Sequence, residues 1–326
     1  MYLVLPENFD GFNGLISLDG ENIAVGRGIT SVINRKSFTT KTLFDGEASR
    51  PMGWYSNYQL IVQKYEDNCQ VIIYNILTNK YEPLNINQNI QMGSSGLGHW
   101  VGGYAKGKRV VRDGVLLSEG IDWYCGGEGE WSVILSESDV YVYSEFDLIH
   151  KLPLPFISRY FAIVREGMCG FGRNGQPQLL NCLTGKITNE SVCKYGESEP
   201  CFSVNQIATA IEHPSPFVAI RFVGKKECIS LPVKEGCIGV DFKVIGETGI
   251  VYSWSNVGRG VIQNCDLNQE RHLIEMPNPP ITYLIDKRAP NPVGPNYDKP
   301  SSPDPIIEPF DHSFILVQYL TRDINI

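Results

Sequence analysis

The sequence predicts an all-β protein built from about seven copies of one strand-rich unit. Runs of four to eight β-branched and aromatic residues alternate with Gly, Asn, Asp and Pro, and no segment has the periodicity of a long helix. Seven runs of similar pattern begin at Ser31, Val71, Val110, Val140, Leu179, Cys228 and Val261. Their starts are 40, 39, 30, 39, 49 and 33 residues apart. The chain therefore contains an internal repeat of about 40 residues.

A strand-rich repeat of this length is typical of the blades of a β-propeller. In period and strand pattern, over roughly residues 10–280, the chain resembles β-propeller repeat proteins. The Gly-His and Trp-Asp signatures of the WD type and the paired glycines of kelch blades are missing. The resemblance implies seven blades, with six or eight as alternatives, and such folds serve mostly as rigid interaction platforms.

The elements of the units can be assigned in order. The first unit has strands at 14–18, 22–25, 31–34 and 41–44, and the second at 60–65, 70–75 and 81–84. Later units are expected to open at 98–104, 131–135, 160–164, 206–211 and 249–254. The glycine-rich stretch 92–98 is expected to connect two blades. The step of 49 residues before Cys228 indicates an insertion, placed at His213-Pro214-Ser215-Pro216.

A proline-rich extension follows the repeats. Between Pro277 and Pro309 lie ten of the 20 prolines, a density that excludes regular strand pairing. We therefore divide the chain into a propeller at 1–280 and an extension at 281–326, which ends in a strand at 314–320. That strand either closes the ring, with the early strand at 2–5 as its natural partner, or docks a binding partner outside the ring.

Composition restricts the class of function. With 42% apolar and 20% charged residues the chain can bury a core, and its net charge of −8 argues against nucleic-acid binding. No apolar run is long enough for a membrane span, and the start of the chain lacks the basic leader of a secretory signal. The nine cysteines form no CxxC pair, which favours free thiols in a reducing compartment. We expect cytoplasmic synthesis, with a virion as one destination.

One cluster combines aromatic and acidic side chains around glycines, between residues 122 and 131. Its candidate contact residues for a ligand or partner are Asp122, Trp123, Tyr124, Glu128, Glu130 and Trp131. Aromatic faces stack on sugar rings and carboxylates accept hydrogen bonds from hydroxyls, so the cluster could bind a glycan or hydrolyse one. The competing interpretation is that the aromatics pack between blades and the acidic turn is solvated.

No catalytic, cofactor or metal site is recognisable. The sequence Gly170-Phe171-Gly172-Arg173-Asn174-Gly175 has the spacing of a dinucleotide-binding loop, but residues 176–181 are expected to form a strand where that loop needs a helix. The five histidines are far apart, and no serine elbow is present. We therefore expect neither an enzyme nor a bound cofactor or metal.

The sequence favours a non-enzymatic structural or interaction propeller within a larger assembly, such as a component of a bacteriophage capsid or tail. The expected partners are other proteins of that assembly. The alternative is a glycan-binding or glycan-cleaving propeller that uses the cluster at 122–131.

Overall fold

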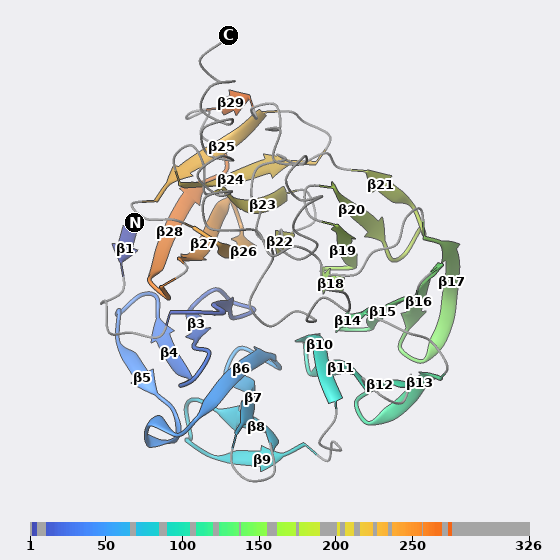
Figure 1. The fold of residues 1–326 in the computed structure, drawn as a ribbon, viewed down its shortest axis with the longest axis horizontal. Helices are drawn as coiled ribbons and strands as arrows, with labels where there is room; N and C mark the ends of the chain where they lie inside the picture. Colours follow the sequence, from blue (N-terminus) through green and yellow to red (C-terminus); the bar gives the residue numbers. More distant parts are fainter. Residues whose placement is uncertain are drawn as a thin grey trace, which may run out of the picture. The chain divides into compact units, whose positions relative to one another are not determined.

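The computed structural model contains seven antiparallel sheets (Figure 1). The structure describes residues 2–4, 11–65, 70–84, 90–104, 109–119, 124–136, 138–154, 162–173, 176–189, 201–202, 206–211, 216–223, 227–233, 237–255, 257–268 and 273–275. All of them belong to one compact unit, Met1–Val192 with Gly196–Met276. The predicted boundary at 280, the extension 281–326 and its strand at 314–320 lie outside the described residues.

The first five sheets each consist of four consecutive strands, which we call blades 1 to 5. Blade 1 contains β2 (Leu15–Ile16), β3 (Asn22–Val25), β4 (Ser31–Asn34) and β5 (Thr40–Thr42). Blade 2 contains β6 (Ser49–Trp54), β7 (Gln59–Lys64), β8 (Val71–Asn75) and β9 (Tyr81–Pro83). Blade 3 contains β10 (Ile90–Gly96), β11 (His99–Tyr104), β12 (Arg109–Arg112) and β13 (Val115–Glu119). Blade 4 contains β14 (Tyr124–Glu128), β15 (Trp131–Leu135), β16 (Asp139–Ser144) and β17 (Asp147–Pro153). Blade 5 contains β18 (Ala162–Arg165), β19 (Met168–Arg173), β20 (Gln176–Asn181) and β21 (Ile187–Asn189).

The last two blades each recruit a strand from elsewhere in the chain. Blade 6 contains β22 (Cys201–Phe202), β23 (Gln206–Ile211), β24 (Phe217–Phe222), β25 (Glu227–Pro232) and a fifth strand, β29 (Leu273–Glu275). Blade 7 contains β26 (Gly239–Ile245), β27 (Thr248–Trp254), β28 (Gly260–Asp266) and, on its outer edge, β1 (Tyr2–Val4). The one helix among the described residues is the short 3-10 turn η1 (Phe44–Gly46), and none is long and apolar enough to span a membrane.

The ring is closed. The innermost strands β2, β6, β10, β14, β18, β22 and β26 each contact the next, and β26 contacts β2 again. At the closing blade, β1 pairs antiparallel with β28 through Tyr2↔Gln263, Leu3↔Ile262 and Val4↔Val261. The protein is therefore a seven-bladed β-propeller, as predicted, and the early strand closes it against β28.

The hydrophobic core is divided among the interfaces between neighbouring blades. One cluster joins blades 1 and 2 through Val32, Leu60 and Val62, and another joins blades 4 and 5 through Val142, Val164 and Leu180. Further clusters lie between blades 2 and 3, 3 and 4, 6 and 7, and 7 and 1. This division explains how a chain of 326 residues folds without one large core.

Three of the predictions about the elements are wrong. Residues 92–98 do not connect blades: 90–96 form β10, the innermost strand of blade 3. The units expected to open at 98, 131, 206 and 249 in fact open one strand earlier, at β10, β14, β22 and β26. The insertion predicted before Cys228 is also wrong, because Cys228 lies in the fourth strand of its blade and not in the third. The third strands begin at 31, 71, 109, 139, 176, 217 and 260, so their steps run only from 30 to 43 residues.

Inner strands such as β6, β10 and β14 were missed in the sequence pattern because they carry small residues where neighbouring blades approach closely. A Cβ atom on Gly53 of β6 would lie 2.1 Å from Ser95 Oγ of β10. A Cβ on Gly127 of β14 would lie 2.3 Å from Val101 Cγ2 of β11. Glycine in such a strand marks close approach of another chain segment and not a break in the sheet.

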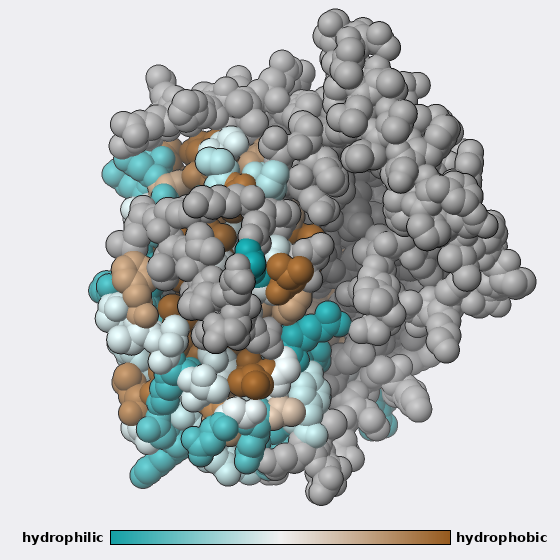
Figure 2. All heavy atoms as spheres, turned by 60° about the vertical axis from the view of Figure 1, so that its left-hand side comes forward, coloured by the Kyte–Doolittle hydropathy of each residue, from teal (hydrophilic) through white to brown (hydrophobic). Residues whose placement is uncertain are grey.

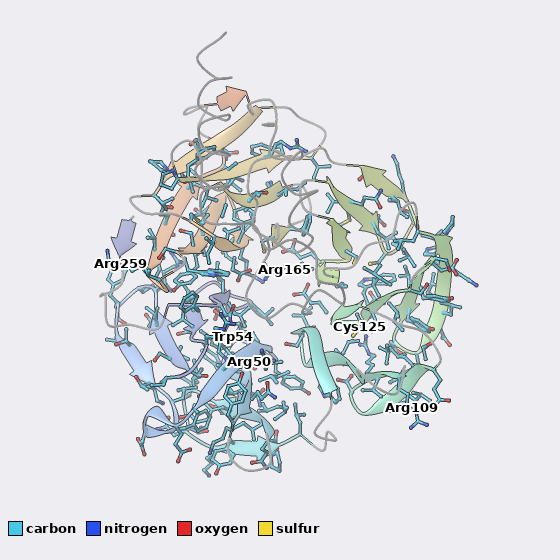
Figure 3. The ribbon with its side chains drawn as sticks, viewed as in Figure 1. Arg50, Trp54, Arg109, Cys125, Arg165 and Arg259 are labelled. Atoms are coloured by element: carbon cyan, nitrogen blue, oxygen red, sulfur yellow. The ribbon has the colours of Figure 1, made fainter. Side chains whose placement is uncertain are left out.

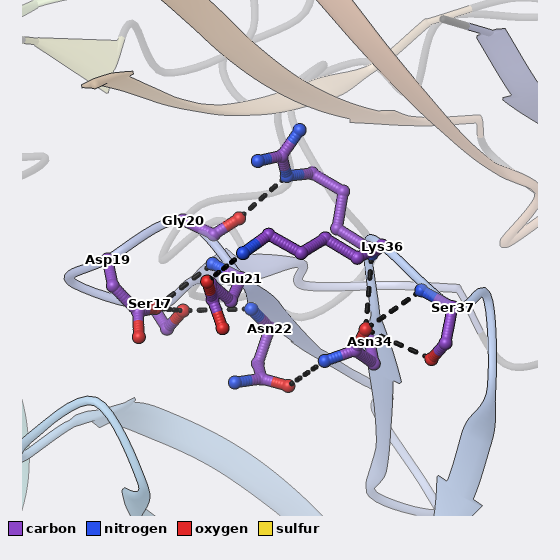
Figure 4. Close-up of polar contacts among 9 residues, drawn as sticks. Ser17, Asp19, Gly20, Glu21, Asn22, Asn34, Lys36 and Ser37 are labelled. Carbon is purple, nitrogen blue, oxygen red and sulfur yellow. Dashed lines mark hydrogen bonds and ion pairs between the residues drawn. The ribbon is translucent and has the colours of Figure 1, made fainter. Parts of the chain in front are cut away.

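A recurring turn joins the third and fourth strands of blades 1, 2 and 5. Asn34, Asn75 and Asn181 end the third strands, and their Oδ1 atoms accept hydrogen bonds from backbone N–H groups two or three residues on, at 2.9–3.1 Å. Each asparagine N–H donates to the carbonyl five residues later. Figure 4 shows the blade 1 example, in which Asn34 Oδ1 accepts from Lys36 and Ser37 and Asn34 Nδ2 donates to Asn22 Oδ1. These side chains shape the turn as Asx motifs do.

We expect Asn75→Ala to lower the free energy of unfolding by about 1 kcal/mol, because the N–H groups of Leu77 and Thr78 lose their shared acceptor. Urea unfolding measures the difference. Asn75→Asp keeps an acceptor oxygen and is the matched control. Equal destabilisation by both substitutions would contradict the role given to Oδ1.

Candidate interaction surface

The cluster at 122–131 is a hairpin joined to its neighbours. Tyr124 and Glu128 begin and end β14, Trp131 begins β15, and Glu130 lies in the turn between the two strands. Asp122 and Trp123 lie outside the described residues, and of Tyr124 only the backbone is described. The structure therefore brings Glu128, Glu130 and Trp131 together at the turn of one hairpin.

Two of these three residues connect blades 4 and 5. Glu128 is buried, and its Oε2 accepts the backbone N–H of Glu166 at 2.6 Å. Trp131 is partly buried against the core shared by blades 4 and 5. Glu130 is exposed and accepts the Ser144 hydroxyl at 3.0 Å. Interblade packing thus accounts for Glu128 and Trp131, and leaves Glu130 as the carboxylate that faces solvent.

The hairpin turn is held by Arg112 of blade 3, a residue that the sequence did not single out. Its buried guanidinium donates to the carbonyls of Gly129 and Glu130 and to the Ser132 hydroxyl. Burial lowers the pKa of Arg112, an effect opposed by the carboxylates of Asp113, Glu145 and Glu130. Three acidic side chains therefore surround one buried cation at the edge of blades 3 and 4.

A second charged group lies near the centre of the ring, where Figure 3 labels Arg165. Asp241 of β26 accepts hydrogen bonds from Arg165 Nη2 of blade 5 at 2.7 Å and from the Ile16 backbone N–H of blade 1 at 2.6 Å. The Cys201 thiol of blade 6 lies 3.1 Å from Asp241 Oδ1. Burial alone would lower the pKa of Arg165, but the Asp241 carboxylate raises it above its ordinary value. This cluster connects four of the seven blades.

Burial disfavours the thiolate form of Cys201 at this cluster. Burial raises its pKa to about 12, although the Arg165 cation opposes the shift. Cys125, Cys169, Cys182, Cys201, Cys237 and Cys265 are buried and form no disulfide. Within the described parts of the chain, no group of His, Cys, Asp and Glu side chains could hold a metal ion.

The buried thiols predict a loss of stability at alkaline pH. Burial raises the pKa of Cys125, Cys182 and Cys201 from 9.0 to about 12, and that of Cys265 to about 11. Because the folded-state pKa is the higher one, each contribution is complete below pH 9 and is lost as the pH rises towards 11–12. We expect the free energy of unfolding, measured in urea under reducing conditions, to fall steeply from pH 9 to 10.5.

Cys125→Ala isolates one thiol from the other groups that titrate in this range. Near pH 10, the free energy of unfolding of the variant should fall less steeply with pH than that of the wild-type protein, by about 1 kcal/mol per pH unit. If the variant and the wild-type protein keep the same slope, the Cys125 thiol does not have the raised pKa.

Six exposed apolar side chains lie in the outer strands and adjoining turns of the consecutive blades 3, 4 and 5. We call this set the apolar corner: Val115, Leu116, Phe146, Leu148, Ile149 and Leu183, which are 45–70% exposed. They lie on β13, on β17, and in the turns before β17 and β21. His150 Nε2 lies 3.1 Å from the Leu183 carbonyl oxygen and so joins blades 4 and 5 there. The corner comprises six of the 16 exposed large hydrophobic residues among those described.

Figure 2 brings forward the left side of Figure 1, where isolated apolar side chains lie among hydrophilic ones. Blade 2 shows how an apolar residue is accommodated elsewhere: Tyr81 of β9 contacts the ring of Phe44, and the Lys64 ammonium lies 5.9 Å from its ring centre. A contiguous patch of exposed apolar side chains indicates a protein contact.

Acidic residues border the apolar corner. Glu130, Glu145 and Asp147 are exposed at the turns of blade 4, and Asp113 occupies the turn before β13. Asp113 binds His99 Nδ1 through its Oδ2 at 2.8 Å and accepts the Trp100 N–H through its Oδ1 at 2.9 Å. The corner thus combines apolar area with negative charge.

No protein-family model matches the sequence, and no curated protein matches it. The fold is similar to the β-propeller domain of Myceliophteria thermophila Cps50 (Swd1), with a TM-score of 0.57 and 10% identity over 81% of this chain and 99% of that one. A chain of the Mitotic Checkpoint Complex gives a TM-score of 0.56 and 11% identity over 81% and 90%. PorZ of Porphyromonas gingivalis gives 0.53 and 10% over 85% of this chain and 39% of that one. At identities of 10–11%, these structural similarities establish the propeller fold alone. That fold is compatible with a protein-interaction scaffold.

Proposed function

We propose that this protein is a non-enzymatic interaction scaffold in a larger assembly and that it binds its partner through the apolar corner. The observation that carries the proposal is that six exposed apolar side chains lie in the outer strands and turns of three consecutive blades, close in sequence to exposed carboxylates. The ring behind this surface is closed, and the Arg165–Asp241 ion pair joins blades across it, so the surface is held rigidly. Rigid presentation lowers the entropy lost on binding.

Two structural neighbours are consistent with such a role. One is a chain of the Mitotic Checkpoint Complex, and PorZ is described as an essential bacterial surface component of the type-IX secretion system. Their partners are not transferred to this chain, because the identities of 10–11% support a common fold only. A bacteriophage particle, cytoplasmic synthesis and the lack of enzymatic activity remain predictions from the sequence.

Substitution of the corner tests the proposal. We expect Val115→Ser, Phe146→Ser and Leu183→Ser, combined in one protein, to abolish co-purification of the partner from the native source. The matched control combines Phe38→Ser, Leu77→Ser and Val257→Ser, which alter equally exposed apolar residues on blades 1, 2 and 7. Circular dichroism and thermal unfolding establish that both proteins fold. Loss of the partner from the control alone, or from neither protein, would contradict the assignment of the corner.

The glycan-binding or glycan-cleaving alternative depends on residues 122–131. A glycan array with the wild-type protein and with Glu130→Gln tests it, because Glu130 carries the exposed carboxylate of the hairpin. Binding that is lost in Glu130→Gln would favour this alternative over the scaffold.

A further inference from the structure

The turns that follow the first strands of blades 3, 4 and 5 lie side by side. The Gly129 N–H of blade 4 donates to the Gly96 carbonyl of blade 3 at 3.3 Å, and a Cβ atom on Gly129 would lie 3.2 Å from Leu97 Cδ1. A Cβ atom on Gly167 of blade 5 would lie 3.4 Å from Trp131 Nε1 of blade 4. These three turns therefore form one continuous surface, and Figure 1 shows the strands β10, β14 and β18 that lead into them next to one another.

The turns that follow the third strands of these blades lie on the same face. The first and third strands of an antiparallel blade run in the same direction, so the turns after them emerge on one side of the ring. Backbone bonds join them: the Glu145 N–H donates to the Glu130 carbonyl at 2.6 Å in blade 4, and the Cys182 N–H donates to the Gly167 carbonyl at 2.9 Å in blade 5. We call these six turns the turn surface: residues 97–98, 113–114, 129–130, 145–146, 166–167 and 182–186.

The turn surface is acidic. Four exposed carboxylates lie on it, with at least one from each blade: Asp113, Glu130, Glu145 and Glu166. Lys186 is its one basic residue. Apart from Asp113, which binds His99 and lies 3.7 Å from Arg112, none of these carboxylates forms an ion pair with a described residue. The buried Arg112 directs its Nη atoms to two carbonyls and a hydroxyl. Three exposed negative charges are therefore left without an ion-pair partner.

Exposed apolar side chains lie among these carboxylates. Leu97 is 62% exposed, Phe146 50% and Leu183 70%, one on each of the three blades. Leu97 has a φ of +53°, at the first position of a two-residue turn where Asn, Asp or Gly is usual. The stability of the turn therefore does not account for a leucine there, and its side chain is available for contact. Phe146 and Leu183 belong to the apolar corner, so the two surfaces are continuous.

The arrangement of the carboxylates selects the kind of ligand. A metal ion needs ligands that converge on one point, and no group of described His, Cys, Asp and Glu side chains does so. Here the carboxylates come from four different turns and are spread over three blades, with apolar side chains among them. Such a surface is complementary in charge and polarity to an extended peptide that carries several basic side chains together with apolar ones.

We propose that the turn surface binds a basic segment of a partner protein, in which Arg or Lys side chains reach Glu130, Glu145 and Glu166 and an apolar side chain contacts Leu97. The inference rests on the proposed function, because it names the chemistry of the partner that the apolar corner binds. It also extends that interface from the outer strands to the turns beside the innermost strands.

Peptide binding measured by fluorescence anisotropy is the first test. The probe is a fluorescein-labelled peptide that contains Arg-Arg-Leu-Arg-Arg, compared with peptides in which serine or glutamate replaces every arginine. We expect the full-length protein to bind the arginine peptide and neither of the other two, and rising salt to weaken this binding because the charges are exposed. Failure to bind the arginine peptide, or equal binding of the serine peptide, would overturn the proposal.

Substitutions in the turns locate the site. A triple variant should bind the arginine peptide about 30-fold more weakly, because three exposed charge pairs are lost: it combines Glu130→Gln, Glu145→Gln and Glu166→Gln. Leu97→Asn keeps every charge and suits the turn, and it should weaken binding about fivefold through the lost apolar contact. Binding by the triple variant at wild-type affinity would overturn the proposal.

The matched control removes the same total charge from exposed carboxylates on blades 2 and 7. It combines Glu82→Gln, Glu247→Gln and Asp266→Asn, and should bind the peptide within about twofold of the wild-type affinity. Circular dichroism and thermal unfolding establish that both triple variants fold. Equal weakening by both would show that net charge alone attracts the peptide, and would overturn the assignment of the turn surface.

Co-purification of the partner from the native source separates this inference from the proposed function. Loss of the partner from the serine variant of the apolar corner, but not from the glutamine variant of the turn surface, retains the scaffold and overturns the basic segment. Loss from the glutamine variant, together with loss of the arginine peptide, supports the inference. Retention of the partner by both variants overturns the inference and the proposed function alike.

Discussion

Arg165→Met is expected to lower the free energy of unfolding by about 3–5 kcal/mol, the usual effect of removing one partner from a buried ion pair. Arg165 and Asp241 are joined at 2.7 Å with side chains only 20% and 6% exposed. Without the guanidinium, the Asp241 carboxylate keeps the Ile16 N–H and the Cys201 thiol as hydrogen-bond donors but loses its ion-pair partner. Urea or thermal unfolding measures the loss.

The matched control is Lys36→Met, which removes an ion pair with Glu21 on the surface of blade 1. An exposed pair of this kind contributes less than about 1 kcal/mol. The double variant Arg165→Met with Asp241→Leu should recover part of the lost stability, because no buried charge remains. If Arg165→Met is no more destabilising than Lys36→Met, the cluster near the centre of the ring does not hold blades 5, 6, 7 and 1 together.

Deletion of residues 1–5 is expected to open the ring and to lower the free energy of unfolding by about 2–4 kcal/mol, because β28 loses the backbone hydrogen bonds that β1 supplies. The exposed edge of β28 would also become available to other chains. We therefore expect the truncated protein to melt at a lower temperature and to aggregate with increasing concentration.

A synthetic peptide of residues 1–10 provides the control. Added to the truncated protein, it should restore the melting temperature by occupying the edge of β28, whereas a peptide of the same composition in scrambled order should not. A truncated protein that is monomeric and as stable as the full chain would show that another segment closes blade 7.

Much of the fold could be predicted from the sequence because the second and third strands of each blade are apolar on both faces. Strands such as β7 and β8 are buried between neighbouring blades, and their runs of Ile and Val stand out between turn residues. Inner strands such as β10 and β14 could not be found in this way. Residues 90–96 and 124–128 are rich in Gly and Ser because neighbouring blades leave no space for larger side chains. A second signal was available, since Asn34, Asn75 and Asn181 mark the same turn in three blades.

The surface could not be predicted because the sequence of an exposed outer strand resembles that of a buried one. Leu148, Ile149 and Leu152 are as apolar as the residues of a buried strand, and only the position of β17 at the end of its sheet exposes the first two. The central ion pair was missed for a different reason. Arg165 and Asp241 are 76 residues apart in the chain and become neighbours only when the ring closes.

Hydrogen exchange of the complete protein, free and in the complex isolated from its native source, tests most directly whether the apolar corner of blades 3–5 is the interface. We predict that binding slows amide exchange in β13, in β17 and in the turn at 182–186, and leaves the turns of blades 1, 2 and 7 unchanged. Protection confined to the turns of blades 1, 2 and 7, with the corner exchanging as fast as in the free protein, would contradict the account.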